Sequence, residues 1–147
     1  MAAIPASVEL AIRAVADDVR PASNWLAQSC EERGVPASQI LRLDLCLNEV
    51  LANVIAYGGD HALECPVSLR LEVGGEAQTH HASVTVRDSG TAFDATAAPL
   101  GSRPLTLDEA EPGGLGLLMM RELSDALTYR HDSGQNELTF SVHWGGA

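Results

Sequence analysis

Apolar and polar side chains alternate in five short stretches of the chain, and this period of two predicts five β-strands. The predicted strands are Val8–Ile12, Cys65–Val73, His81–Arg87, Ala126–His131 and Glu137–Trp144. Gly74 and Gly75 follow the second strand and predict a hairpin turn to the third. The sequence from Asp132 to Gly134 predicts another tight turn between the last two strands.

Three other stretches have helical spacing. Residues 17–34 begin with two aspartates, continue with an apolar periodic run and stop at a glycine, as helices commonly do. Residues 36–57 carry apolar side chains at intervals of three and four, which predicts a long helix with one face in the core. A glycine pair, Gly58 and Gly59, closes this pattern. A third helix is predicted from Leu117 to Leu123.

The order of these elements predicts an α+β fold. Strands and helices follow one another as β-α-α-β-β-loop-α-β-β, which favours a two-layer sandwich with the helices on one face of a mainly antiparallel sheet. Residues 1–147 are expected to form a single domain. Residues 95–112 lack any periodicity and exceed the usual length of a connection, which is typical of functional lids and mobile segments.

The net charge and the cysteine spacing argue against several classes of function. Nine basic against twenty acidic residues give a net charge of −11, which argues against direct binding to nucleic acid or to an anionic membrane surface. No apolar stretch is long enough to span a membrane, and the first residues do not resemble a secretion leader. The cysteines at 30, 46 and 65 fit no metal-binding spacing and are expected to be reduced thiols in a cytoplasmic protein.

The long helix carries the first candidate site. Glu49 and Asn53 are four residues apart and therefore project from the same side of the helix, with Arg42, Cys46 and Tyr57 extending a polar row. A carboxylate and an amide oxygen at this spacing suit acid–base chemistry and a hard divalent cation. Taken alone, a solvated helix face is the commoner explanation for such a pair.

Two further motifs carry candidate chemistry. Asp88 ends an apolar strand and Gly90 follows it, so a buried acceptor and a closely approaching backbone could meet a ligand there, although a plain turn is the favoured explanation of this motif taken alone. The stretch from Gly113 to Gly116 opens the third helix, where backbone N–H groups and the helix dipole favour an anion such as phosphate. An ordinary hinge has about even odds for that glycine motif. Neither a Walker A motif nor a Rossmann fingerprint is present.

As an ordered set, these motifs resemble the GHKL ATPase superfamily, in which they form the N, G1 and G2 boxes of the Bergerat ATP-binding fold. The segments Leu45–Gly58 and Gly113–Asp125 look most like those of the anti-sigma factor serine/threonine protein kinases. The resemblance covers roughly residues 8–144 and implies ATP and Mg²⁺ as cofactors.

The resemblance implies a role for each matched residue. Glu49 matches the general base that acts on a serine hydroxyl, and Asn53 matches the ligand of the Mg²⁺ that bridges the ATP phosphates. Asp88 matches the acceptor of the adenine amino group, and Gly90 the glycine that lets the base approach. Tyr57 stands where a histidine is common and is assigned no chemistry.

The glycine motif and the loop before it complete the implied site. Gly114 and Gly116 match the phosphate-binding glycines, and Gly113 and Leu115 would contribute neighbouring amides. The loop of residues 95–112 would be the ATP lid, in which Arg103 is the basic residue available for a phosphate contact. The second glycine that is common in the G1 box is absent near Ala92, a departure that we expect nucleotide binding to survive.

The resemblance implies a homodimeric anti-sigma factor with ATP-dependent serine kinase activity. Such a protein binds a sigma factor and phosphorylates a serine of an anti-anti-sigma (STAS-domain) partner. One alternative is a nucleotide-binding partner-switch module with little or no kinase activity, although the presence of Glu49 removes the simplest reason to expect a dead enzyme. The catalytic domain of a two-component histidine kinase ranks behind both, because the sequence has no room for the helix that carries the phosphorylated histidine.

Overall fold

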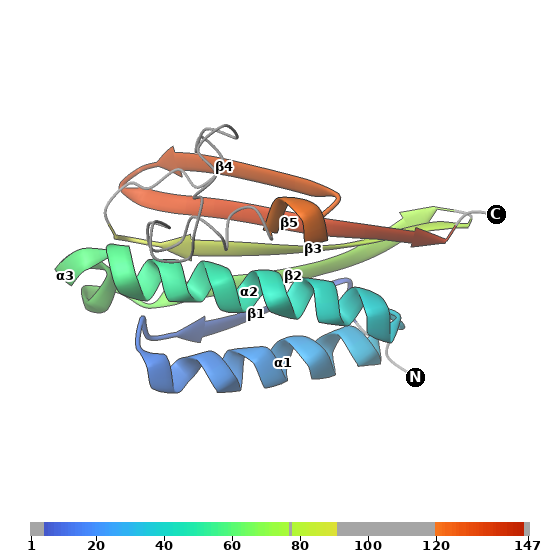
Figure 1. The fold of residues 1–147 in the computed structure, drawn as a ribbon, viewed down its shortest axis with the longest axis horizontal. Coiled ribbons are helices and arrows are strands. Elements are labelled where there is room, and N and C mark those ends of the chain that lie inside the picture. Colours follow the sequence, from blue (N-terminus) through green and yellow to red (C-terminus); the bar gives the residue numbers. More distant parts are fainter. Residues whose placement is uncertain (1–4, 77, 91–119, 146–147) are drawn as a thin grey trace, which may run out of the picture.

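The computed structural model describes residues 5–76, 78–90 and 120–145. These residues form a two-layer α+β sandwich (Figure 1). The elements are β1 (Ser7–Ile12), the short 3₁₀ helix η1 (Ala16–Asp18), α1 (Val19–Glu32), α2 (Ala37–Tyr57), α3 (Gly59–Glu64), β2 (Val67–Glu76), β3 (Thr79–Asp88), β4 (Ala126–Asp132) and β5 (Gln135–Gly145). Of the predicted third helix, residues 120–123 are described, and they are helical.

The sheet has the strand order β1-β2-β3-β5-β4, and every neighbouring pair is antiparallel. The predicted fold class is therefore confirmed. The hairpins β2–β3 and β4–β5 are both present, and β5 inserts between β3 and β4. This insertion places Asp88, the last residue of β3, directly opposite Asn136 near the start of β5.

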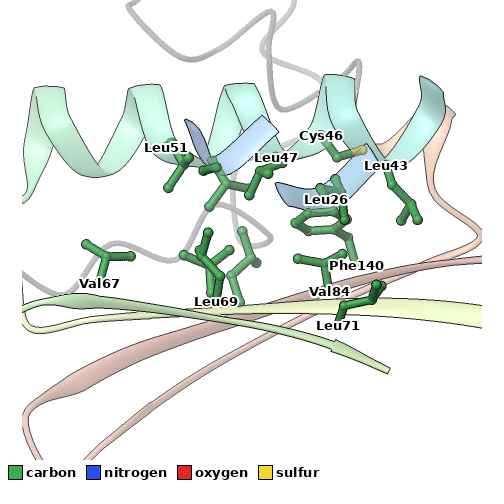
Figure 2. Packing of buried hydrophobic residues seen from close by; sticks show 14 of the residues in the cluster. Leu26, Leu43, Cys46, Leu47, Leu51, Val67, Leu69, Leu71, Val84 and Phe140 are labelled. Atoms are coloured by element: carbon green, nitrogen blue, oxygen red, sulfur yellow. The ribbon is translucent and has the colours of Figure 1, made fainter. Parts of the chain in front are cut away.

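Helices α1 and α2 lie side by side across one face of the sheet (Figure 1). Their apolar faces meet the inward-facing side chains of the strands, and burial of this apolar area stabilises the two layers. Figure 2 shows Phe140 of β5 beneath the two helices, close to Leu26 and Leu47. The largest fully buried side chains are Phe140, Leu26, Leu43, Leu47, Leu51, Leu69, Leu71, Met120, Val67, Val84, Val86 and Val142.

The residue that follows α2, Gly58, is a glycine for a steric reason. A Cβ atom at this position would lie 2.5 Å from both the carbonyl oxygen of Val54 and the Cβ of Ala62. A glycine is therefore needed where the chain leaves α2 and immediately enters α3. The sequence predicted the end of α2 correctly, but the glycine pair was taken as the end of all helical structure, and α3 was not predicted.

Three details differ from the sequence predictions. Gly74 and Gly75 do not form the turn but continue β2, where they pair with His81 and His80. Cys46, which was placed in a polar row, is buried in the core and donates its thiol to the carbonyl of Met120 at 4.0 Å. Aliphatic side chains such as those of Ile55 and Leu117 are ordinarily core residues. Ile55 is instead 38% exposed, and Leu117 lies outside the described residues.

Within the described ranges, no helix combines the length and the apolar character that crossing a membrane requires.

Candidate nucleotide-binding site

A pocket opens between the C-terminal half of α2 and one end of the sheet. Its void, counted together with the open solvent at its mouth, is about 440 Å³. The surface of its wall is mostly apolar, and several polar side chains also line it. The lining residues are Val50, Asn53, Val54, Tyr57, Gly58, Val86, Asp88, Tyr129, Asn136 and Leu138.

Asp88 is the buried acidic group of this pocket. Its side chain is held at the end of β3 because Oδ1 accepts two hydrogen bonds, from the backbone N–H of Gly90 at 2.9 Å and from Nδ2 of Asn136 at 3.1 Å. Both donors reach the same oxygen, so the carboxylate is fixed in one orientation. An oriented buried acceptor of this kind can select a ligand that offers a donor.

Asn136 connects three parts of the site. Besides Asp88, its Nδ2 donates to the carbonyl of Gly90 at 3.3 Å. Its Oδ1 accepts a hydrogen bond from the hydroxyl of Tyr129 on the neighbouring strand β4. The C-terminal hairpin therefore fixes both the adenine-matching aspartate and the turn that follows it.

Gly90 packs against the end of α2. A Cβ at Gly90 would lie 2.7 Å from the Cα and the carbonyl oxygen of Gly58 and 2.9 Å from Oδ1 of Asp88. The sequence suggested that this glycine lets a ligand approach. In the structure, the backbone of Gly58 lies close to Gly90, so the residues after β3 pack directly against the end of α2.

Asn53 and Glu49 are placed by α2. Asn53 is half-buried and lines the same pocket as Asp88. Glu49 lies one turn earlier, half-buried and outside the set of lining residues. Partial burial raises the pKa of the Glu49 carboxyl above its ordinary value, because desolvation disfavours the charged form. A raised pKa moves a carboxylate towards the range that suits a general base.

The other three residues of the predicted polar row on α2 lie in different surroundings. Arg42 does not face the pocket but forms an ion pair with Asp125 at 3.2 Å, which ties the start of α2 to the segment before β4. Cys46 is in the core, as described above. Tyr57 lines the pocket beside Asn53.

Five of the predicted site residues lie outside the described residues. They are Arg103, Gly113, Gly114, Leu115 and Gly116, and the predicted ATP lid at residues 95–112 lies there as well. The part of the predicted site that the structure describes is therefore the pocket around Asp88 and the helix that carries Asn53 and Glu49.

The Mg²⁺ that the family resemblance implies would find one oxygen ligand among the described residues of the pocket. No group of three or more histidine, cysteine, aspartate or glutamate side chains within the described ranges could hold a metal ion by itself. Mg²⁺ commonly takes one or two oxygen ligands from the protein and completes its shell with phosphates and water. The amide oxygen of Asn53, at the wall of the pocket, fits that role.

Two functional candidates were missed by the sequence analysis. Asn136 and Tyr129 lie in a hairpin whose alternation was recognised, but neither forms part of a local motif. Strand register brings both residues to the pocket. The register of β3 and β5 pairs Asp88 with Asn136. The register of β4 and β5 pairs Tyr129 with Leu138. The polar Asn136 in an otherwise apolar inward row was the available signal.

Comparison with known proteins identifies the family of this chain. The family of histidine kinase-like ATPase domains matches residues 12–142. The chain belongs to that family. A curated relative, the serine/threonine-protein kinase BtrW of Bordetella bronchiseptica, is 34% identical over 102 residues, which are 69% of this chain and 68% of the relative. The resemblance to the anti-sigma factor kinases is thus confirmed as a family relationship.

Solved structures show the same fold. The RsbU and RsbW domains of Rv1364c from Mycobacterium tuberculosis match 98% of this chain with a TM-score of 0.69 and 15% identity. This chain spans 34% of that longer protein. The SiaB–SiaC complex of Pseudomonas aeruginosa matches 93% of this chain and 89% of the other, with a TM-score of 0.56 and 12% identity.

Proposed function

We propose that this protein is an ATP- and Mg²⁺-dependent serine kinase that also acts as an anti-sigma factor. The observation that carries the proposal is the pocket that Asp88 and Asn53 both line, with Glu49 one turn along α2. Its membership of a kinase-like ATPase family and its 34% identity to a serine/threonine-protein kinase support the same reading.

Asp88 would recognise the adenine base. Gly90 and Asn136 both donate to Oδ1, so the second carboxylate oxygen remains to accept the adenine amino group. Guanine carries a carbonyl oxygen at the equivalent ring position and would set an acceptor against an acceptor. The aliphatic wall formed by Val50, Val54 and Val86 suits the flat apolar faces of the base.

Glu49 would act as the general base in phosphoryl transfer. The oxygen of the acceptor serine forms a bond to the γ-phosphorus while the bond from that phosphorus to the bridging oxygen breaks, and ADP leaves. The hydroxyl proton passes to the Glu49 carboxylate. Mg²⁺, held by Asn53 and the phosphates, would neutralise developing charge. Gly113, Gly114, Leu115, Gly116 and Arg103 are proposed to hold the phosphates, under a lid at residues 95–112.

The proposed partners follow from the family. We propose a sigma factor as the bound target, an anti-anti-sigma (STAS-domain) protein as the phosphorylated substrate, and a homodimer as the working form. A sequestered sigma factor would be released when the STAS-domain protein captures the kinase. The net charge of −11 is compatible with competition for a basic, DNA-binding surface of a sigma factor.

A transfer assay tests this function. The purified protein is incubated with γ-labelled ATP, Mg²⁺ and purified STAS-domain proteins of the source organism, and the modified residue is identified by mass spectrometry. We expect label on one serine of one STAS-domain protein, and no label with Glu49→Gln. Tight nucleotide binding without transfer to any of these proteins would contradict the kinase and favour a nucleotide-binding partner-switch module.

A further inference from the structure

Two histidines lie directly opposite each other on the central strands β3 and β5. His81 pairs with His143 in the strand register, and the centres of their imidazole rings are 6.2 Å apart. The next residues along the two strands, Ala82 and Val142, are buried in the core beneath the helices. Because side chains alternate between the two faces of a strand, both histidines point to the sheet face away from α1 and α2. The His143 side chain is 52% exposed and His81 is half-buried.

The neighbours of the two histidines on this face are small. Gly74 is the partner of His81 on β2, and a Cβ atom there would lie 2.9 Å from Cε1 of the imidazole. The next pair along the same face of β3 and β5 is Ser83 and Ser141. These residues therefore do not fill the space around the two rings.

Asp125 orients the ring of His143. Its carboxylate accepts hydrogen bonds from the backbone N–H of His143 at 2.6 Å and from Arg42 at 3.2 Å, and Oδ2 lies 3.7 Å from Nδ1 of the His143 ring. A carboxylate on this side favours the tautomer that carries its proton on Nδ1, so Nε2 is left as the unprotonated nitrogen. Metal-binding histidines in proteins commonly have a carboxylate partner of this kind.

The spacing of the two rings suits a single metal ion. Bonds of about 2.0–2.1 Å to one nitrogen of each imidazole hold the two ring centres roughly 5 Å apart. The observed separation of 6.2 Å is slightly longer, and a small rotation of the two side chains closes the difference. Imidazole nitrogens suit Cu²⁺, Ni²⁺ and Zn²⁺, and Cu²⁺ generally forms the strongest complexes among these ions.

We propose that His81 and His143 form a surface site for a divalent transition metal ion, with Cu²⁺ bound most tightly. No group of three or more histidine, cysteine, aspartate or glutamate side chains within the described ranges could hold a metal ion. The two histidines would therefore be the protein ligands, and water would complete the coordination shell. The bound ion would link β3 to β5.

This site is separate from the proposed nucleotide pocket. Asp88 lies on the same strand as His81 but seven residues further along, which is about 23 Å in an extended strand. Mg²⁺ prefers oxygen ligands and is not expected at an imidazole pair. The inference therefore does not depend on the proposed kinase function.

The test measures binding of Cu²⁺, Ni²⁺ and Mg²⁺ to the full chain, prepared without a histidine tag. Every protein carries Cys65→Ser, because Cys65 is the exposed cysteine and its thiol would compete for copper. His81→Ala and His143→Ala each remove one proposed ligand. His80→Ala is the matched control, because His80 lies next to His81 but points to the opposite face, where it stacks on Trp144 with the ring centres 5.7 Å apart.

Calorimetry should give tight binding of one Cu²⁺ per chain, weaker binding of Ni²⁺ and no binding of Mg²⁺ at the histidine pair. The electron paramagnetic resonance spectrum of the copper complex should show two nitrogen ligands. His81→Ala and His143→Ala should each weaken Cu²⁺ binding by about tenfold or more, because the second ligand of a pair binds as an intramolecular step. His80→Ala should keep the Cu²⁺ affinity of the parent protein.

Metal binding should also stabilise the fold, because an ion that bridges two strands binds the folded chain in preference to the unfolded one. With Ni²⁺ at about 100 times its dissociation constant, the midpoint of thermal unfolding should rise by roughly 5–10 °C. The rise should be the same in His80→Ala and much smaller in His81→Ala, and unfolding without metal checks that each variant folds.

Two results would overturn the proposal. One is a Cu²⁺ affinity that does not change in His81→Ala or does not change in His143→Ala. The other is a loss of affinity in His80→Ala as large as that in His81→Ala, because the copper would then bind without regard to the pairing of the two histidines.

Discussion

Asp88 and Asn136 lie directly opposite each other on β3 and β5, and Nδ2 of Asn136 donates to Oδ1 of Asp88 at 3.1 Å. The two residues are 48 positions apart in the chain. Both are buried, so this bond is made in a region where an unpaired polar group would be costly. The aspartate that we assign to adenine recognition is thus fixed by the last hairpin of the fold.

Asp88→Asn should weaken nucleotide binding while leaving the fold intact. The amide oxygen of the new side chain can still accept from Gly90 and Asn136, but its NH₂ group would then face the adenine amino group, donor against donor. We expect a loss of about 1–3 kcal/mol in binding free energy. Isothermal calorimetry with ATP measures this loss, and thermal unfolding checks the fold. An unchanged ATP affinity would show that the adenine pocket is wrongly placed.

Asn136→Ala should lower both stability and nucleotide affinity. The variant removes the donor to Asp88 and Gly90 and leaves the Tyr129 hydroxyl without this acceptor. We expect the free energy of unfolding to fall by about 1–3 kcal/mol. Tyr129→Phe is the matched control: it keeps the bond between Asn136 and Asp88, so its nucleotide affinity should change less. Equal affinities in the two variants would contradict a positioning role for Asn136.

Gly90→Ala should disturb the site and the fold together. The added Cβ would lie 2.7 Å from the backbone of Gly58, and overpacking of this kind commonly costs about 1–3 kcal/mol. Gly34→Ala is the control, because Gly34 has a φ of 78° but no atom within 4 Å of the added Cβ. Both variants should lose stability in urea unfolding, but only Gly90→Ala should lose ATP affinity. A Gly90→Ala protein with wild-type affinity would count against this contact as part of the site.

The sequence predicted the elements well where local periodicity sets the structure. Apolar residues at intervals of three and four define α2, and alternation defines all five strands, because each pattern reflects one face packed against the core. The hairpin turn between β2 and β3 was predicted too early, at Gly74 and Gly75, because glycines often end a strand. In the structure both glycines continue β2, where they pair with His81 and His80.

The candidate site was predictable only in part. Glu49, Asn53 and Asp88 belong to local motifs and were identified from sequence. Asn136 and Tyr129 were not, because strand register and the insertion of β5 between β3 and β4 bring them to the pocket. Burial of Cys46 and exposure of Ile55 show the same limit: each lies near the edge of the core-facing arc of α2, where tertiary packing decides.

Glu49→Gln should stabilise the protein at neutral pH relative to the wild type. The pKa of Glu49 is raised by burial, so the folded protein holds this proton more tightly than the unfolded chain. The associated stability is present below the unfolded pKa of about 4.3 and is lost as pH rises through the folded pKa. Glutamine carries no charge at any pH, so the stability advantage of the variant should grow across this interval.

Urea unfolding of both proteins at a series of pH values measures this difference. If the free energy of unfolding of the wild type instead increased relative to that of Glu49→Gln as pH rises, the pKa of Glu49 would not be raised in the folded protein. The same ionisation should appear in catalysis: the transfer rate of the wild type should rise with pH through a pKa above that of an ordinary glutamate.

The most direct test of the account is phosphoryl transfer by Glu49→Ala compared with its affinity for ATP. Glu49 lies outside the lining of the pocket, whereas Asn53 and Asp88 line it. We therefore predict that Glu49→Ala binds ATP nearly as tightly as the wild type and transfers no labelled phosphate to the serine of a STAS-domain protein. Transfer by Glu49→Ala at the wild-type rate would contradict the assignment of this residue as the base and, with it, the proposed mechanism.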